Sequence, residues 1–167
     1  TNSLINTTDT TISGTNFVLG IVYTFFYDGI FKWFYKVSDV AGNSISTANF
    51  TITIDTIIPL VNITYPLNIT YNVDVIYLDY TYSDLNPGSC WYSNSSGIWN
   101  SSISSAGENF TNVITKEGGN TFTIYCNDSA RNTNSTNVTF FKDTINPMLN
   151  LTYPQNTTYN INVSTLN

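Results

Sequence analysis

Residues 55–75 read DTIIPLVNITYPLNITYNVDV, and residues 143–163 read DTINPMLNLTYPQNTTYNINV. The two stretches begin 88 residues apart, and 13 of their 21 positions are identical. The similarity continues upstream with a one-residue offset, since SDVAGN at 38–43 corresponds to NDSARN at 127–132. A fixed internal period indicates an array of like domains and gives the size of each domain. The chain is therefore expected to belong to a tandem repeat.

Short alternating runs separated by turn residues fill one period. In NTFTIYCND, the side chains of Phe122, Ile124 and Cys126 lie on one face of a strand, and the runs at 50–55 and 138–143 alternate in the same way. A period of 88 residues made of short strands has the size of an immunoglobulin-like sandwich. We predict an all-β fold of tandem Ig-like β-sandwiches, with Greek-key topology and about seven strands each.

The period divides the chain into three parts. Residues 1–56 form a partial Ig-like domain with only the later strands, 57–144 form a complete domain, and 145–167 hold the first strands of a further domain. The strands of the complete domain are expected near 60–65, 73–83, 89–94, 97–103, 108–116, 120–128 and 136–143.

The Asp-Thr-x-x-Pro sequence marks each junction. It begins at Asp55 and ends at Pro59 in the first copy, and it runs from Asp143 to Pro147 in the second. Because proline fixes φ and cannot donate to a β-ladder, we expect both segments to be short, stiff inter-domain linkers.

The two partial domains are complementary. Aligned with the complete domain, the final segment carries about what the first one lacks, apart from the strand near 80–93. Residues 145–167 of one subunit are therefore candidates to complete the first domain of a neighbouring subunit by strand addition. A head-to-tail contact of this kind does not close and produces a filament. The alternative is that the chain is an excerpt of a longer array, and the sequence leaves both possibilities open.

The stretch FVLGIVYTFFYDGIFKWFYKV at 17–37 is the most apolar part of the chain. It contains three charged residues, and Asp28-Gly29 is a hairpin-turn signal between alternating runs, so we predict strand–turn–strand and no membrane span. Alternation directs about half of its aromatic rings inward. The outward rings of Tyr27 and Phe34 are then available to a neighbouring subunit or to a glycan.

Composition argues against several classes of protein. The chain has no His, five basic residues and a net charge of -6, which is too few scattered cations for nucleic acid. Glu108 and Glu117 do not face each other across a cleft, and no pairing of nucleophile and base is readable, so we expect no enzyme.

Cys90 and Cys126 both fall in the complete domain. In an Ig-like arrangement they would lie on strands C and F, which we expect to face each other across the two sheets. Two cysteines without histidine cannot build a structural zinc site. A disulfide is favoured over a pair of buried thiols, and closing this loop would stabilise the domain by roughly 3–4 kcal/mol.

Asn-x-Ser/Thr sequons occur thirteen times among 24 Asn residues. A strand with Asn and Thr on its outward face and an apolar residue on its inward face contains such a sequon by alternation alone, whether or not it carries a glycan. Seven of the thirteen sequons have an apolar middle residue. The other six lie in turn-like stretches, and glycans would supply the solubility that a charged fraction of 10% does not. We predict N-glycosylation at Asn6, Asn49, Asn62, Asn68, Asn94, Asn100, Asn109, Asn127, Asn134, Asn137, Asn150, Asn156 and Asn162.

Four aspartates near the predicted domain junctions offer oxygen ligands of the kind that Ca²⁺ prefers: Asp39, Asp55, Asp128 and Asp143. Their spacing matches no calcium-loop motif, and the capping of turns is the favoured role for a short carboxylate. We predict no cofactor and no metal site, with inter-domain Ca²⁺ as the alternative.

Four motifs, YCNDSARN at 125–132, SDVAGN at 38–43, DTIIP at 55–59 and SCWYS at 89–93, together resemble the tandem Ig-like repeats of large archaeal cell-surface proteins and related bacterial modules. The resemblance covers essentially the whole chain, although Arg131 stands where these repeats usually have Gly. Such modules serve as spacers, filaments, surface-layer elements and adhesins, so the resemblance implies the repeat type more than the role.

The expected function is therefore structural. We predict an N-glycosylated subunit of an extracellular or cell-surface filament, whose partners are copies of itself and its N-linked glycans. The alternatives are an adhesin or glycan-binding ectodomain, and a passive stalk or surface-layer spacer. Binding near residues 84–97 by a monomer would favour the adhesin.

Overall fold

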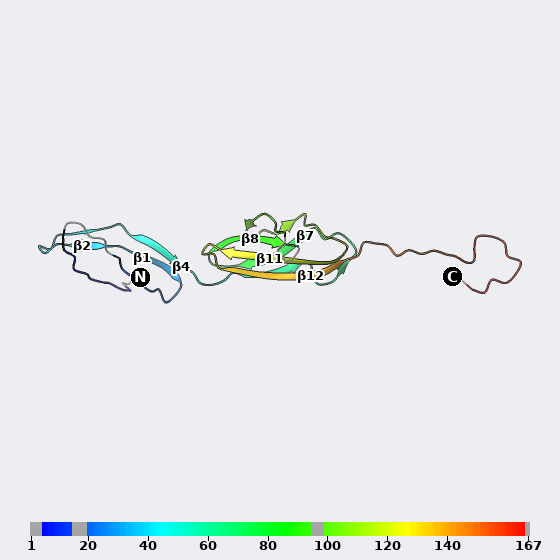
Figure 1. Ribbon diagram of the computed structural model, residues 1–167, viewed down its shortest axis with the longest axis horizontal. Coiled ribbons are helices and arrows are strands. Elements are labelled where there is room, and N and C mark those ends of the chain that lie inside the picture. Colours follow the sequence, from blue (N-terminus) through cyan, green and yellow to red (C-terminus); the bar gives the residue numbers. More distant parts are fainter. Residues whose placement is uncertain (1–4, 15–19, 95–98, 166–167) are drawn as a thin grey trace. The chain divides into compact units, whose positions relative to one another are not determined.

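The computed structural model describes residues 5–14, 20–94 and 99–165. Over these residues the regular secondary structure consists of β-strands with no helix, which confirms the predicted all-β class (Figure 1). No part of the described chain forms a helix long and apolar enough to cross a membrane. The chain divides into two compact units, Thr1–Thr56 and Ile57–Asn167, and each is described by itself.

The second unit is a sandwich of two sheets (Figure 1). The three-stranded sheet has the order β10 (Phe110–Thr111), β7 (Tyr77–Ser83) and β5 (Leu60–Tyr65). The five-stranded sheet has the order β6 (Thr70–Tyr71), β12 (Thr133–Lys142), β11 (Gly118–Asp128), β8 (Pro87–Ser93) and β9 (Ser104–Ser105). Every pair is antiparallel except β6 with β12, and the chain passes repeatedly between the sheets, as in an Ig-like sandwich.

The core lies between the two sheets and follows the predicted alternation. Phe122, Ile124 and Cys126 on β11 are fully buried, which confirms that they share the inner face. Leu78 and Tyr80 on β7 face them from the other sheet. Each large apolar side chain buried in this way contributes about 1.5–3 kcal/mol, which is why the inner positions determine the register.

Three predicted strands differ in the structure. The strand predicted at 73–83 begins only at Tyr77, as β7. The prediction at 97–103 was wrong for its described part, because residues 99–103 make only an isolated bridge between Asn100 and Ser93; residues 97–98 lie outside the described chain. The strand predicted at 108–116 is reduced to β10. Asn112 has φ of 57° and breaks the ladder, and Val113 is buried beyond it.

In the described part of the first unit, residues 5–14 and 20–56, four short strands form two antiparallel pairs. The strand β1 (Gly29–Trp33) pairs with β4 (Phe50–Ile54), and β2 (Lys36–Ser38) pairs with β3 (Ser44–Ser46). Phe31 lies opposite Ile52, just as Asn120 lies opposite Phe140 in the β11–β12 pair. The first unit therefore contains the counterpart of the last hairpin of the complete sandwich.

The hairpin predicted around Asp28-Gly29 is absent from the described residues. Residues 20–28 form no strand, and residues 17–19 lie outside the described chain. The carboxylate of Asp28 instead accepts hydrogen bonds from the backbone N–H and the hydroxyl of Thr56, each at 3.0 Å. Asp28 thus contacts the end of β4, while β1 begins at the next residue and pairs across to β4.

Candidate functional site

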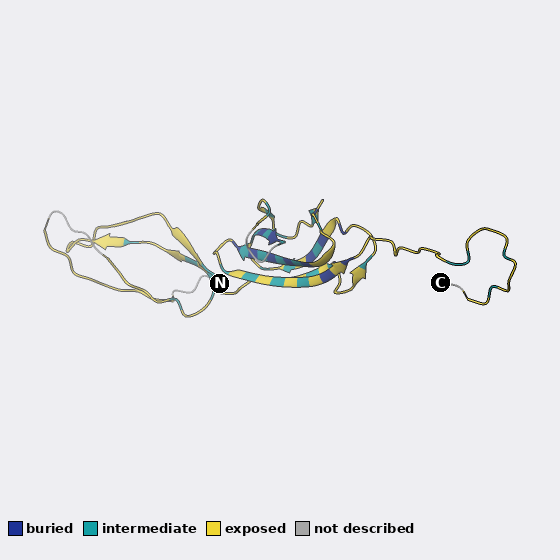
Figure 2. Ribbon diagram, turned by 45° about the vertical axis from the view of Figure 1, so that its right-hand side comes forward, coloured by how far each residue is buried: buried dark blue, intermediate teal, exposed yellow. Residues whose placement is uncertain are grey.

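Part of the inner face of the first unit is exposed to solvent. We call the side chains of Trp33, Val37, Phe50 and Ile52 the open face; their exposed fractions are 43, 49, 48 and 37%. Their counterparts by the repeat are Phe122, Cys126, Val138 and Phe140. Three of these counterparts are fully buried and Val138 is partly buried. Figure 2 shows more buried and less buried residues alternating along the long strands of the second unit, and the mostly exposed strands of the first.

The outer edge of β4 is open as well. In the second unit, the edge of β12 is covered by the parallel strand β6: Phe141 donates its N–H to the carbonyl of Ile69 at 3.0 Å, and Asp143 donates to that of Tyr71 at 2.9 Å. Among the described residues, β4 pairs in a sheet only with β1. Its second row of backbone groups is therefore available to another strand.

Residues 59–75 cover the equivalent surface in the second unit. The ring of Tyr71 packs edge-on against Phe140 with the centroids 5.8 Å apart. Val61 on β5 and Val75 are buried in the same core. Pro66, which lies between them in the sequence, is also fully buried. This segment shows what kind of chain fits on a β11–β12 type hairpin.

Residues 145–165 form no strand, but part of this segment has the local structure of the 65–71 loop. The hydroxyl of Tyr159 accepts the N–H of Gln155 at 2.7 Å, as that of Tyr71 accepts the N–H of Leu67 at 2.8 Å. The rings of Tyr153 and Tyr159 meet edge-on at 5.5 Å, matching the pair in the second unit at 5.7 Å. Both Tyr-Pro peptide bonds are cis.

The apolar side chains of this segment lack a core. Leu149 is 94% exposed and Leu151 is 64% exposed. Their repeat counterparts are Val61, which is 6% exposed, and Ile63, which packs against the core. The strands predicted at 145–167 are absent from its described part because a strand needs a partner for its hydrogen bonds and apolar face.

Cys90 and Cys126 are joined in a disulfide, as predicted. The expectation that they face each other across the two sheets was wrong. They are directly opposite each other on β8 and β11, which are neighbours in one sheet, with Cα atoms 4.1 Å apart. Since the ladder already fixes this separation, the bridge reinforces a strand pair and does not tie the two layers together.

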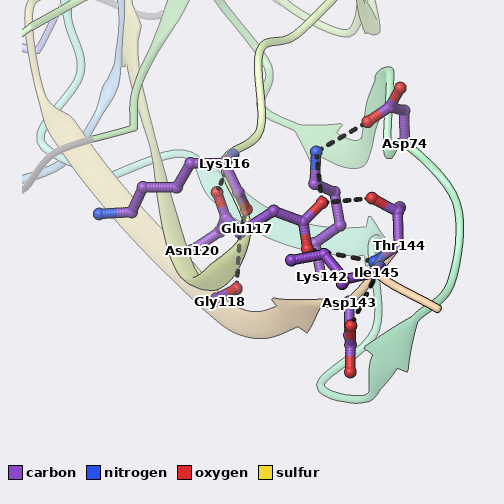
Figure 3. A network of polar contacts seen from close by, with 9 residues as sticks. All are labelled: Asp74, Lys116, Glu117, Gly118, Asn120, Lys142, Asp143, Thr144 and Ile145. Carbon is purple, nitrogen blue, oxygen red and sulfur yellow. Dashed lines mark hydrogen bonds and ion pairs between the residues drawn. The ribbon is translucent and has the colours of Figure 1, made fainter. Parts of the chain in front are cut away.

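A carboxylate contacts the linker threonine at the end of both hairpins. Glu117 accepts the backbone N–H of Thr144 at 3.1 Å and also the threonine hydroxyl, as Asp28 does with Thr56 (Figure 3). These hydrogen bonds lower the pKa of Glu117 from its ordinary value. They fix the second residue after the last strand, which restricts the direction in which the linker leaves.

Lys142 lies beside this contact. Its ammonium is 2.8 Å from the carboxylate of Asp74 and 3.4 Å from that of Glu117 (Figure 3). The hydrogen bond to Asp74, with a smaller contribution from Glu117, raises the pKa of Lys142. The amine is therefore held protonated, as an ion-pair partner and not as a nucleophile.

Three of the four calcium candidates, Asp39, Asp128 and Asp143, accept hydrogen bonds from residues close to them in the sequence. Asp39 and Asp128 cap equivalent turns: each carboxylate accepts the backbone N–H and the amide N–H of the residue four positions on, Asn43 and Asn132, at 2.7–2.8 Å. The hydrogen bonds from Asn43 lower the pKa of Asp39. Asp143 accepts the N–H of Ile145 at 3.2 Å, and Asp55 follows β4 and is partly buried. The prediction of no metal site, with inter-domain Ca²⁺ as its alternative, stays a prediction.

The sequon asparagines are mostly on the surface. Ten of the thirteen are exposed, and Asn94, Asn127 and Asn134 are partly buried. The amide nitrogen of Asn134 donates to the carbonyl of Pro59 at 2.9 Å, and the side-chain oxygen of Asn127 accepts the N–H of Ser89 at 2.9 Å. The exposed Asn109 is engaged too, since its side-chain oxygen accepts the N–H of Tyr80 at 3.1 Å. Sequence reasoning could not identify these hydrogen-bonded amides, because their partners lie far along the chain.

No protein-family model matches the chain, and no curated protein matches it. Among solved structures, the chain is similar to the fibronectin(III)-like modules of Clostridium thermocellum CbhA. The match has 14% sequence identity and a TM-score of 0.42, and it covers 74% of this chain and 68% of that one. The assignment of the second unit as an Ig-like β-sandwich rests on its own strand order and core.

Proposed function

We propose that this chain is a structural subunit of an extracellular or cell-surface filament built from Ig-like domains joined head to tail. The observation that carries the proposal is the pair of matching deficiencies in one chain. The open face displays core-type residues without a cover, and residues 145–165 display the covering residues without a core. Strand complementation between copies satisfies both at once.

The cost of leaving both surfaces in water supports association. Full burial of an exposed large apolar side chain is worth about 1.5–3 kcal/mol, and each side chain of the open face, 37–49% exposed, would gain part of that. Exposed β-edges also recruit further strands. Because the two complementary surfaces differ, each copy can contact two others, and the assembly grows as a filament.

An extracellular location accounts for the remaining features. The disulfide of the second unit is typical of oxidising compartments. Ten exposed sequon asparagines and a charged fraction of only 10% fit a surface kept soluble by N-linked glycans. Intact-mass spectrometry of native material should give a mass well above 18.6 kDa, and a bare chain of that mass would remove the glycans from the proposal.

Electron microscopy of native material and of the purified 167-residue chain tests the filament. We expect filaments from both, and we expect that a variant lacking residues 145–167 forms none. Equal assembly by the truncated variant would contradict complementation. A full-length chain that stays monomeric at every concentration, beside longer threads in native material, would favour a covalent array of spacer domains.

A further inference from the structure

We propose a specific docking register for this contact, which rests on the proposed function: residues 149–163 of a second copy bind β4, with Thr158 and Tyr159 paired in parallel with Thr53 and Ile54. The repeat defines this register. In the second unit, Thr70 lies opposite Phe141 and Tyr71 lies opposite Lys142. Each of these four positions has its counterpart 88 residues away in the proposed pair.

The hairpin of the first unit is a suitable template because its register is already that of the second unit. Gly29 lies opposite Ile54, as Gly118 lies opposite Lys142, and Trp33 lies opposite Phe50, as Phe122 lies opposite Val138. A strand that binds the outer edge of β4 therefore finds backbone N–H and C=O groups with the same alternation as β6 finds on β12.

The side chains of the docking segment and of the open face are apolar at the positions that would meet. Every inward position of 61–75 is apolar again in the second segment, where Leu149, Leu151, Tyr153, Tyr159 and Val163 replace Val61, Ile63, Tyr65, Tyr71 and Val75. Tyr159 would pack on Ile52 as Tyr71 packs on Phe140. The hydrogen bond from Gln155 to Tyr159 already holds that ring in its loop, so less conformational entropy is lost on docking.

The linker sequence indicates a second copy as the partner. The segment DTIIP leads from the hairpin of the first unit into β5, the first strand of the following domain. The segment DTINP follows β12 in the same way, so it should deliver Leu149 into a following domain as well. The first unit holds a hairpin of this type, whose β4 edge is unpaired among the described residues, and a second copy presents that hairpin to the segment. The contact covers the β4 side of the open face; the counterparts of β7 and β8 are not part of it.

Cysteine cross-linking tests the register in the full chain. Thr53→Cys in one copy is mixed with Thr158→Cys in another under mild oxidation, with the native disulfide intact. Thr51→Cys mixed with Thr158→Cys is the matched control, because Thr51 is exposed on the same strand two positions away. We expect at least tenfold more covalent dimer from the 53/158 pair than from the 51/158 pair, and a yield that rises with concentration.

The other outcomes overturn the inference in distinguishable ways. Filaments with equal yields from both pairs would remove this register and leave the filament. A Thr53→Cys/Thr158→Cys double variant that closes only within single chains, at every concentration, would show that the segment folds back on its own copy. Neither polymers nor cross-links would remove both the register and the proposed function. Circular dichroism of each variant verifies that the sandwich is folded.

Discussion

Gly42 and Arg131 occupy equivalent positions in the two Asp-capped turns. Gly42 has φ of 90° and Arg131 has φ of 75°. Both values lie in the left-handed region, which glycine adopts freely and which costs a residue with a Cβ roughly 1–2 kcal/mol. The turn tolerates Arg131 because the carboxylate of Asp128, which is only 2% exposed, fixes it through Asn132.

Arg131→Gly should therefore stabilise the second unit. We expect a gain of about 0.5–1 kcal/mol in the free energy of unfolding, since part of the relieved strain is offset by the entropy of glycine in the unfolded chain. Chemical denaturation measures it. Ala130→Gly is the control. Ala130 has no positive φ, so this substitution should leave the stability unchanged or lower it. A loss of stability in Arg131→Gly would contradict this account of the turn.

Glu117 gives a prediction on pH. Its pKa is lowered from the ordinary 4.5, first by the hydroxyl of Thr144 and then by the backbone N–H of that residue. A carboxyl group with a lowered pKa in the folded state contributes stability above pH 4.5 and loses it as the pH falls through the folded value. NMR titration should show a pKa below 4.5 in the wild-type chain and a higher one in Thr144→Val. An unchanged pKa in the variant would show that the threonine hydroxyl is not the main cause.

At the scale of elements, β8 and β11 are joined by more than their ladder. The disulfide links them across a separation of 36 residues. By the chain-entropy model its removal should lower the free energy of unfolding by about 3–4 kcal/mol. Denaturation of a Cys90→Ala/Cys126→Ala variant measures the loss. A loss below about 1 kcal/mol would contradict the chain-entropy account and would show that residual structure already restricts the unfolded chain without the bridge.

Gly88 marks a close approach within the same strand pair. A Cβ at this position would lie 2.6 Å from the carbonyl oxygen of Asn127 and 2.7 Å from that of Asp128, both backbone atoms that cannot easily move. Gly88→Ala should cost about 1–3 kcal/mol through overpacking. In Gly119→Ala on β11, the new Cβ meets only the ring of Phe141 at 3.7 Å, so we expect little change. Equal stability of the two variants would contradict the close approach.

The sequence predicted those elements whose side chains alternate over a long run. The inner face of Phe122, Ile124 and Cys126 was evident because burial imposes a period of two. The relation of Cys90 to Cys126 was not, since the neighbours of a strand depend on how the chain crosses between sheets. The open face was implicit in the truncated repeat, but its register became visible only when Phe31 was seen opposite Ile52.

The repeated sequence forms a complete sandwich in the second unit only, and parts of a sandwich in the first unit and in residues 145–165. In the second unit, a hairpin and its cover form a closed core. In the first unit the hairpin is present with an open face, and residues 145–165 have the loop of the cover without strands. In the proposed filament, the hairpin of the first unit and residues 145–165 complete each other between copies.

Sedimentation velocity with a competing peptide tests the proposed strand complementation between copies. The full chain is studied over a range of concentrations, alone and with an excess of a synthetic peptide of residues 145–165 or of a scrambled peptide. We predict that the mean mass rises with concentration, falls towards that of the monomer with the native peptide, and is unchanged by the scrambled one. A mean mass that ignores the native peptide, or a chain that is monomeric throughout, would contradict the claim.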